Sequence, residues 1–262
     1  MLGAIVGDVA GSVYERANVK SKAIALFGPG SRCTDDSVLT VALAEALLDG
    51  ADLAATLRAH HARYPEAGFG PTFLAWVRSP PGTPAPRSAS NGAAMRVSPV
   101  GWAFDTLDAV LQAARDCTLL THDHPDAVAG AQATAGAVFL ARQGAGKAAI
   151  RAWVEAHCGY DLSVPLDAVR PHYAFELSCA GTVPHALRAF LEGHDVEDTL
   201  RNAISIGGDS DTLACIAGAV AEAHYGGVPA ALAVPAWRAL DDAQRAVVTR
   251  FARRHGVPLA VV

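Results

Sequence analysis

Two acidic clusters in this chain consist of residue types that bind divalent metal ions. The segments Thr34–Asp36 and Asp209–Thr212 each stand just ahead of an apolar, helix-like run. Together they offer four carboxylates and two threonine hydroxyls, and such oxygen ligands favour hard cations such as Mg²⁺ or Mn²⁺ over Zn²⁺. Two divalent ions would neutralise the four carboxylates, as in two-metal hydrolytic sites. If the fold brings the clusters together, the sequence predicts a metal centre with two ions.

Helix capping is the simpler alternative for these acids. Thr and Asp are favoured N-caps, and the first helical turn tolerates an extra acid. One cap needs only one such residue, so capping and metal binding both stay open for Thr34–Asp36. The second cluster follows Gly207 and Gly208, which allow unusual backbone angles or close approach. Its alternating acids can direct two carboxylates to one ion, as calcium loops do, although the other EF-hand positions are missing.

The N-terminal segment carries a third acidic element. Gly3, Gly7 and Gly11 recur every four residues and predict a flat helix face for close packing. Asp8 and Glu15 are seven residues apart, so we expect both on one adjoining face, although a solvated face would also suit Glu15. An unpaired acid is costly in an apolar, glycine-lined segment. We therefore expect Asp8 to be hydrogen-bonded near the site.

Two further polar segments could contact a ligand. Ser88–Arg96 combines small polar residues with glycine, so its backbone N–H groups could approach an anion such as phosphate, although an ordinary turn explains it as well. Thr121–Pro125 contains His122 and His124, an incomplete set for a metal. A helix start with Pro125 in its first turn is the alternative, and a histidine could also stack on or hydrogen-bond to a ligand ring.

The rest of the chain predicts helices. Nine segments are rich in Ala and Leu, and no convincing strand or hairpin appears. We therefore expect an all-α fold with one compact domain over residues 1–262. The proline-rich stretch 79–90 cannot be regular helix, and we interpret it as a surface loop that ends at the site. The predicted helices are Ser37–Leu48, Leu53–Arg63, Ala103–Arg115, Pro125–Arg142, Gly146–His157, Val183–Leu191, Val196–Ile204, Leu213–Tyr225 and Ala243–Gly256.

Composition narrows the class of protein. The net charge is -5 and no Lys/Arg run occurs, so a nucleic-acid partner is not expected. The five cysteines are scattered without CxxC or zinc spacing, which favours reduced thiols in a cytoplasmic protein. The apolar start lacks a positive n-region, and no stretch approaches the roughly 18 apolar residues of a membrane span. We expect a cytoplasmic monomer.

Taken in order, these segments resemble the ADP-ribosylglycohydrolase family, of the dinitrogenase reductase-activating glycohydrolase and ADP-ribosyl-acceptor hydrolase type. The resemblance covers nearly the whole chain and is most specific at the two acidic clusters. It implies an all-α, single-domain fold with a binuclear Mg²⁺ or Mn²⁺ centre in a cleft. It runs through Gly7–Glu15, Cys33–Ser37, Asn91–Arg96, Thr121–His122 and Ser205–Thr212.

Position by position, the resemblance also implies roles. Glu15 matches an acid near the metals in serine-directed members, so Glu15, Asp35 and Asp36 are the candidates for handling the proton. Ala89 stands where some members have an aromatic residue against the adenosine, so adenine stacking would have to come from elsewhere. The implied metal ligands are Thr34, Asp35, Asp36, Asp209, Asp211 and Thr212, and the implied substrate-binding residues are Ser88, Ser90, Asn91, Gly92 and His122.

The implied activity is metal-dependent hydrolysis of the glycosidic bond between ADP-ribose and a modified acceptor, an arginine or serine side chain of a protein. A negatively charged site suits the oxocarbenium-like transition state of such a reaction. Two alternatives stay open: hydrolysis of a small ADP-ribosyl metabolite, and a non-catalytic ADP-ribose-binding protein. Because all four acids of the clusters are present, the binding-only alternative is the weaker one.

Overall fold

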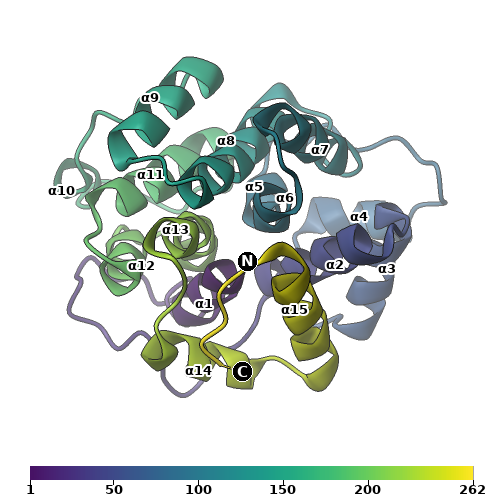
Figure 1. Cartoon of the computed structure of the whole chain (residues 1–262), viewed down its shortest axis with the longest axis horizontal. Helices are drawn as coiled ribbons and strands as arrows, with labels where there is room; N and C mark the ends of the chain where they lie inside the picture. The colour runs from purple at the N-terminus through teal and green to yellow at the C-terminus, as the bar shows by residue number, and fades with distance from the viewer. Residues whose placement is uncertain (262) are drawn as a thin grey trace.

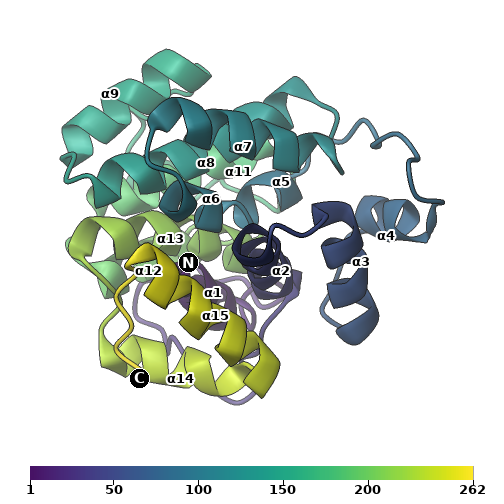
Figure 2. The ribbon, with the colours of Figure 1, turned by 45° about the vertical axis from the view of Figure 1, so that its right-hand side comes forward.

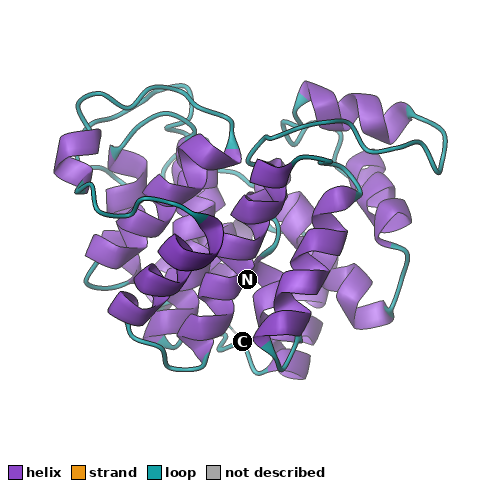
Figure 3. Ribbon diagram, turned by 90° about the horizontal axis from the view of Figure 1, so that it is seen from above, coloured by secondary structure: helices purple, strands orange, loops and turns teal. Residues whose placement is uncertain are grey.

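Helices make up all the regular structure of the described chain. The computed structural model describes residues 1–261, and within this range it contains helices and no strands (Figure 3), which confirms the expected all-α fold. The final residue of the expected domain, Val262, lies outside the described residues. The helices are α1 (Leu2–Gly11), α2 (Asp35–Asp49), α3 (Leu53–Arg63), α4 (Pro71–Arg78), α5 (Gly92–Met95), α6 (Ser98–Ala103), α7 (Leu107–Leu119), α8 (Pro125–Arg142), α9 (Lys147–Cys158), α10 (Leu166–Val169), α11 (Cys179–Glu192), α12 (Val196–Ser205), α13 (Ser210–Tyr225), α14 (Ala230–Ala239) and α15 (Asp242–His255).

Helices α1 and α13 lie side by side at the centre of the molecule (Figure 1). Every residue of α1 is buried, and so is α13 from its first residue to Ala223, as expected for helices that are apolar on all sides. The other helices surround this pair. The stretch between α4 and α5 runs along the outside as a loop (Figure 2), as predicted for the proline-rich segment.

The glycine stripe of α1 is the reason why the central pair packs so closely. A Cβ atom at Gly3 would lie 2.2 Å from the Gly218 carbonyl oxygen, and one at Gly7 would lie 2.0 Å from the Ala214 oxygen. The two backbones therefore touch without side chains between them. Gly11 lies against Asp211, so the end of α1 meets the start of α13. The predicted flat face is confirmed, and it brings the segment around Asp8 to the second acidic cluster.

All nine predicted helices are present, with shifted ends. Helix α7 starts at Leu107, four residues later than predicted, because the Thr106 side chain caps it by accepting a hydrogen bond from Ala109 N. Helix α11 starts at Cys179, four residues earlier than the predicted start at Val183, and it continues through Pro184. The short helices α4, α5, α6 and α10, and also α14, were not predicted.

No helix of the described chain is long and apolar enough to cross a membrane. The five cysteines are free, in agreement with the predicted reduced thiols.

Candidate active site

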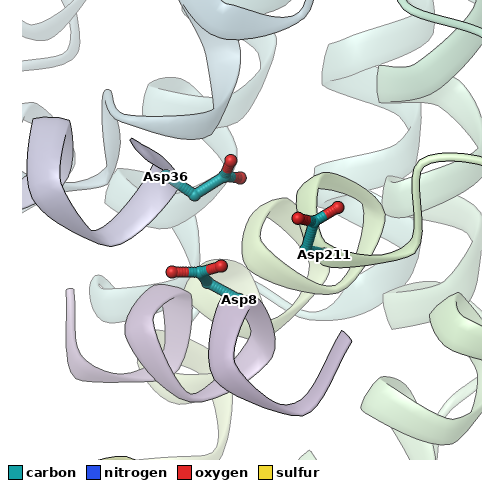
Figure 4. A group of neighbouring side chains, drawn as sticks. All are labelled: Asp8, Asp36 and Asp211. Atoms are coloured by element: carbon teal, nitrogen blue, oxygen red, sulfur yellow. The ribbon is translucent and has the colours of Figure 1, made fainter. Parts of the chain in front are cut away.

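The fold brings together three carboxylates from three helices. Asp8 of α1, Asp36 of α2 and Asp211 of α13 point toward one another (Figure 4). Each offers an oxygen within 4.8 Å of the others, and all three side chains are buried. The two acidic clusters, which lie in opposite halves of the sequence, therefore meet, as the metal-centre hypothesis requires.

Asp8 holds the first cluster in place. Its carboxylate accepts hydrogen bonds from Thr34 N at 3.0 Å, Thr34 Oγ1 at 2.6 Å and Ser37 N at 3.1 Å, and also from Ser37 Oγ. Burial raises the pKa of Asp8, and these four hydrogen bonds oppose that rise. The expected hydrogen bonding of Asp8 is confirmed. Since both of its oxygens are used in this way, Asp8 positions the start of α2 over α1.

Capping explains only part of the two clusters. Thr34 is the N-cap of α2, with its hydroxyl accepting from Asp36 N at 3.3 Å. Asp209 stands at the N-cap position of α13 but makes no capping bond, and instead accepts from Asn91 Nδ2 at 2.6 Å. The carboxylates of Asp35, Asp36 and Asp211 therefore need another explanation.

One carboxylate oxygen provides an independent sign of a cation. Asp36 Oδ1 is buried and has no hydrogen-bond partner among the described residues, whereas Asp36 Oδ2 lies 3.4 Å from the hydroxyls of both Thr34 and Thr212. A buried charged oxygen without a partner is costly. The carboxylate and hydroxyl oxygens near this position are the ligands that a hard divalent cation prefers.

The acids also repel one another. Burial, followed by the charges of neighbouring carboxylates, raises the pKa of Asp36 and of Asp211 well above the usual range. Burial and the charges of Asp8, Asp209 and Glu15 raise the pKa of Asp35 to about 7. A divalent cation between these groups would favour their charged forms and return the pKa values toward the ordinary range.

The acids line one wall of a cavity of about 260 Å³. All six residues predicted as metal ligands line it, and so do Glu15 and four of the five residues predicted to bind substrate. Ser88 does not line the cavity, but its hydroxyl lies 3.0 Å from Ser90 Oγ. The predicted residues that line the cavity are Glu15, Thr34, Asp35, Asp36, Ser90, Asn91, Gly92, His122, Asp209, Asp211 and Thr212.

Glu15 reaches the cavity from a turn. The expectation that it shares a helix face with Asp8 was wrong, because α1 ends at Gly11. Asn18 holds the turn in place: its side-chain oxygen accepts from Gly208 N at 2.5 Å, and its nitrogen donates to Glu15 O at 2.7 Å. Gly208 has a left-handed φ of +74°, which glycine adopts readily. The turn with Glu15 is thus fastened to the turn that begins α13.

A chain of hydrogen bonds beside the cavity runs from the buried Arg96 to Ser90. Arg96 donates to Thr121 Oγ1 at 2.5 Å, and Thr121 Oγ1 lies 2.7 Å from His122 Nδ1. His122 Nε2 in turn lies 2.9 Å from Ser90 Oγ.

This chain fixes the tautomer of His122. Burial and the charge of Arg96 lower the pKa of His122 to about 3, so its ring is neutral. A guanidinium can only donate, so the Thr121 hydroxyl accepts from Arg96 and donates to His122 Nδ1. The proton of the ring then lies on Nε2 and is donated to Ser90 Oγ, which leaves the Ser90 hydroxyl hydrogen free to bind an anion.

The second histidine of this region has a structural role. His124 is the N-cap of α8 and accepts from Asp126 N at 3.1 Å, and Pro125 is the first residue of the helix. The helix-start interpretation is therefore correct for His124. Sequence reasoning gave Arg96 no role, although a single charge between the apolar residues Met95 and Val97 was a usable signal.

Comparison with known proteins identifies the family of the chain. A family model described as ADP-ribosylglycohydrolase matches residues 1–257. ADP-ribosylhydrolase ARH3 of Mus musculus is 29% identical, with 86% of this chain and 82% of the relative covered. The ADP-ribosylhydrolase ARH3 of Homo sapiens is 28% identical, with 86% and 84% covered. A solved structure described as an ADP-ribosylglycohydrolase-related protein complex superposes with a TM-score of 0.69 at 26% identity, with 96% of each chain covered. The chain therefore belongs to the ADP-ribosylglycohydrolase family, as its motifs indicated.

Proposed function

We propose that the protein is a metal-dependent hydrolase that cleaves the glycosidic bond between ADP-ribose and a modified acceptor, an arginine or serine side chain of a protein. Family membership supports ADP-ribosyl hydrolysis. Two observations carry the metal dependence: Asp8, Asp36 and Asp211 meet, and a buried oxygen of Asp36 has no hydrogen-bond partner among the described residues.

The two acidic clusters would hold two divalent ions, Mg²⁺ or Mn²⁺. The ligands would be Thr34, Asp35, Asp36, Asp209, Asp211 and Thr212, all of which line the cavity. Bound cations supply Lewis-acid stabilisation and lower the pKa of a bound water. The protein adds a cavity with acids on one wall, which favours positive charge at the anomeric carbon as the bond breaks.

The remaining residues of the cavity would bind the diphosphate and transfer the proton. The Ser90 hydroxyl, freed by the Nε2–H of His122, would donate to a diphosphate oxygen together with the Gly92 amide. Glu15 would transfer the proton, because its partly buried carboxylate lines the cavity on the side of the acids.

The test is release of free ADP-ribose from arginine-linked and serine-linked peptides, with Mg²⁺ and with EDTA. Metal-dependent release from either peptide would support the proposal and identify the acceptor. Hydrolysis that persists in EDTA would refute the metal centre. A chain that binds ADP-ribose but hydrolyses no conjugate would be a binding protein, and hydrolysis of small ADP-ribosyl compounds alone would favour a metabolite substrate.

The ligand assignment has its own variants. Asp36→Asn and Asp211→Asn should each lower turnover by at least about a hundredfold, since losing a metal ligand costs more than losing a residue that supports one. Asp123→Asn is the matched control, because Asp123 is exposed and lies outside the cavity. Turnover at the wild-type level in either ligand variant would refute the assignment.

A further inference from the structure

Two large apolar side chains lie exposed beside the cavity. In the described chain only Val164, Phe175 and Leu177 are large hydrophobic residues with high exposure, and Phe175 and Leu177 are 52% and 50% exposed. Leu177 also lines the cavity. Single exposed apolar residues are ordinary, whereas neighbouring ones at a binding site suggest a contact surface.

The segment that carries them, residues 173–178, is held firmly in place. Leu177 O accepts from Asn91 N at 2.7 Å, and Tyr173 O accepts from Lys20 Nζ at 2.6 Å. Between these points the Glu176 carboxylate accepts from Ser178 N at 2.7 Å. Phe175 and Leu177 are thus kept exposed by a fixed backbone.

Phe175 and Leu177 are both exposed, while Glu176 between them is partly buried and lies against Gly181 of α11. The side chain of the intervening residue is therefore turned toward the protein, and the two apolar side chains are left at the surface. Leu177 lines the cavity, and Phe175, two residues away, adds a second exposed apolar side chain near it.

The position of this surface indicates which part of a substrate would meet it. The segment starts against Gly208, where a Cβ atom would lie 2.6 Å from the Tyr173 ring. Gly208 is bonded to Asn18, which also holds Glu15. Tyr173 and Ala174 therefore lie against the turn that Asn18 fastens to Glu15, and Phe175 follows them directly in the chain. Glu15 is the residue beside which we place the breaking bond, so this segment starts at the acceptor end of the cavity.

Two arginines add positive charge at the same end. The Arg16 side chain is 90% exposed, and its only ion-pair partner among the described residues is Glu15, at 3.8 Å. Arg32 is exposed and makes no ion pair within the described residues, and its backbone N–H donates to Ser12 Oγ at 3.1 Å, close to the turn with Glu15. Both arginines line the cavity, on a chain whose net charge is -5.

We propose that Phe175, Leu177, Arg16 and Arg32 form an acceptor rim that binds the polypeptide carrying the ADP-ribosylated residue. This inference rests on the proposed function and makes its substrate a protein segment instead of a small metabolite. An apolar side chain near the modified residue covers Phe175 and Leu177, and acidic residues on the same segment pair with the arginines. The rim therefore selects acceptors in acidic segments that contain an apolar residue.

The experiment compares two substrates that share the linkage to ADP-ribose. One is a peptide with the modified residue flanked by Leu and Glu, and the other is the same modified amino acid without a peptide. Phe175→Ser should lower kcat/KM about fivefold on the peptide, because about half of a Phe side chain becomes covered. It should leave kcat/KM on the free amino acid conjugate unchanged. In a separate comparison, the wild type should have a lower kcat/KM on a peptide with Lys in place of Glu than on the original peptide.

Val164→Ser is the matched control, because Val164 is 44% exposed and lies outside the cavity, and it should change neither value. Equal losses on both substrates in Phe175→Ser would mean that Phe175 serves the ADP-ribose part or the fold, and would refute the rim. No loss on either substrate would also refute it. Failure of the proposed function is distinguishable, because the wild type would then hydrolyse neither substrate or only the free amino acid conjugate.

Discussion

Replacing Asp35 by Asn should stabilise the metal-free protein at neutral pH. Asp35 lies partly buried at the start of α2, and the charges of Asp8, Asp209 and Glu15 add to the effect of burial on its pKa. Its pKa of about 7 in the folded protein lies above the ordinary value of 3.8. Between these values the folded state binds more protons than the unfolded state, so stability falls as pH rises from about 4 to 7. Asn has nearly the same shape and no charge, so it removes this loss.

The magnitude follows from the shift. About three pKa units correspond to about 4 kcal/mol, and since Asp35 is only partly buried, solvent screening leaves about 2 kcal/mol. For a chain of this size that is roughly 5 °C in Tm. The gain should be complete above pH 7 and should vanish near pH 4, where the wild-type carboxyl is protonated in both states.

Thermal unfolding in EDTA at a series of pH values from 4 to 8 measures this gain. Asp123→Asn, which removes an exposed charge outside the cavity, should show no such pH-dependent gain. In saturating Mg²⁺ or Mn²⁺ the order should reverse, because the wild type has one more carboxylate for the cation. An Asp35→Asn protein that is no more stable than the wild type in EDTA at pH 7.5 would show that the acids do not repel one another as described.

Three further predictions concern the supports of the site. Gly7→Ala should cost at least about 3 kcal/mol of stability, because its Cβ would lie 2.0 Å from Ala214 O, whereas Gly28→Ala, with no atom within 4 Å, should cost almost nothing. Chemical denaturation compares the two variants, and similar losses would contradict the packing argument. Asp8→Ala, which removes the acceptor that holds the first cluster, should weaken Mn²⁺ binding about tenfold to a hundredfold in calorimetry, and unchanged affinity would exclude a positioning role. The ring of His122 should stay neutral from pH 5 to 8, since its pKa is about 3, and an NMR titration step near pH 6.5 would contradict the assigned tautomer.

Local sequence patterns predicted the parts of the site that depend on one segment. The clusters at Thr34–Asp36 and Asp209–Thr212 each stand at the start of a helix, and the glycines of α1 recur every four residues. These features can be recognised from adjacent residues of the sequence alone. The nine long helices were found for the same reason. Five other helices were missed: α5 and α10 have only four residues each, too few for a periodic pattern, and α4, α6 and α14 gave no signal that the prediction used.

Features that depend on pairing across the fold could not be predicted. The segment of Phe175 is held by a hydrogen bond between Leu177 O and Asn91 N, and Asn91 lies over 80 residues earlier in the chain. No local sequence pattern predicts that contact. Glu15 lies at the cavity because Asn18 fixes its turn to Gly208. The seven-residue spacing from Asp8 wrongly suggested a shared helix face, since α1 ends at Gly11. The role of Arg96 depends on its hydrogen bond to Thr121, which lies 25 residues later in the chain, in the turn after α7.

The backbone contact between α1 and α13 also has a consequence for the order of folding. The carboxylates around the proposed metal centre come from residues 8–36 and 209–211, so they cannot meet before the chain has closed a loop of more than about 170 residues. Such distant contacts form late, and interactions that are absent from the folding transition state act on the rate of unfolding. A cation bound there would therefore slow unfolding and lengthen the lifetime of the native state, while the folding rate would stay nearly unchanged.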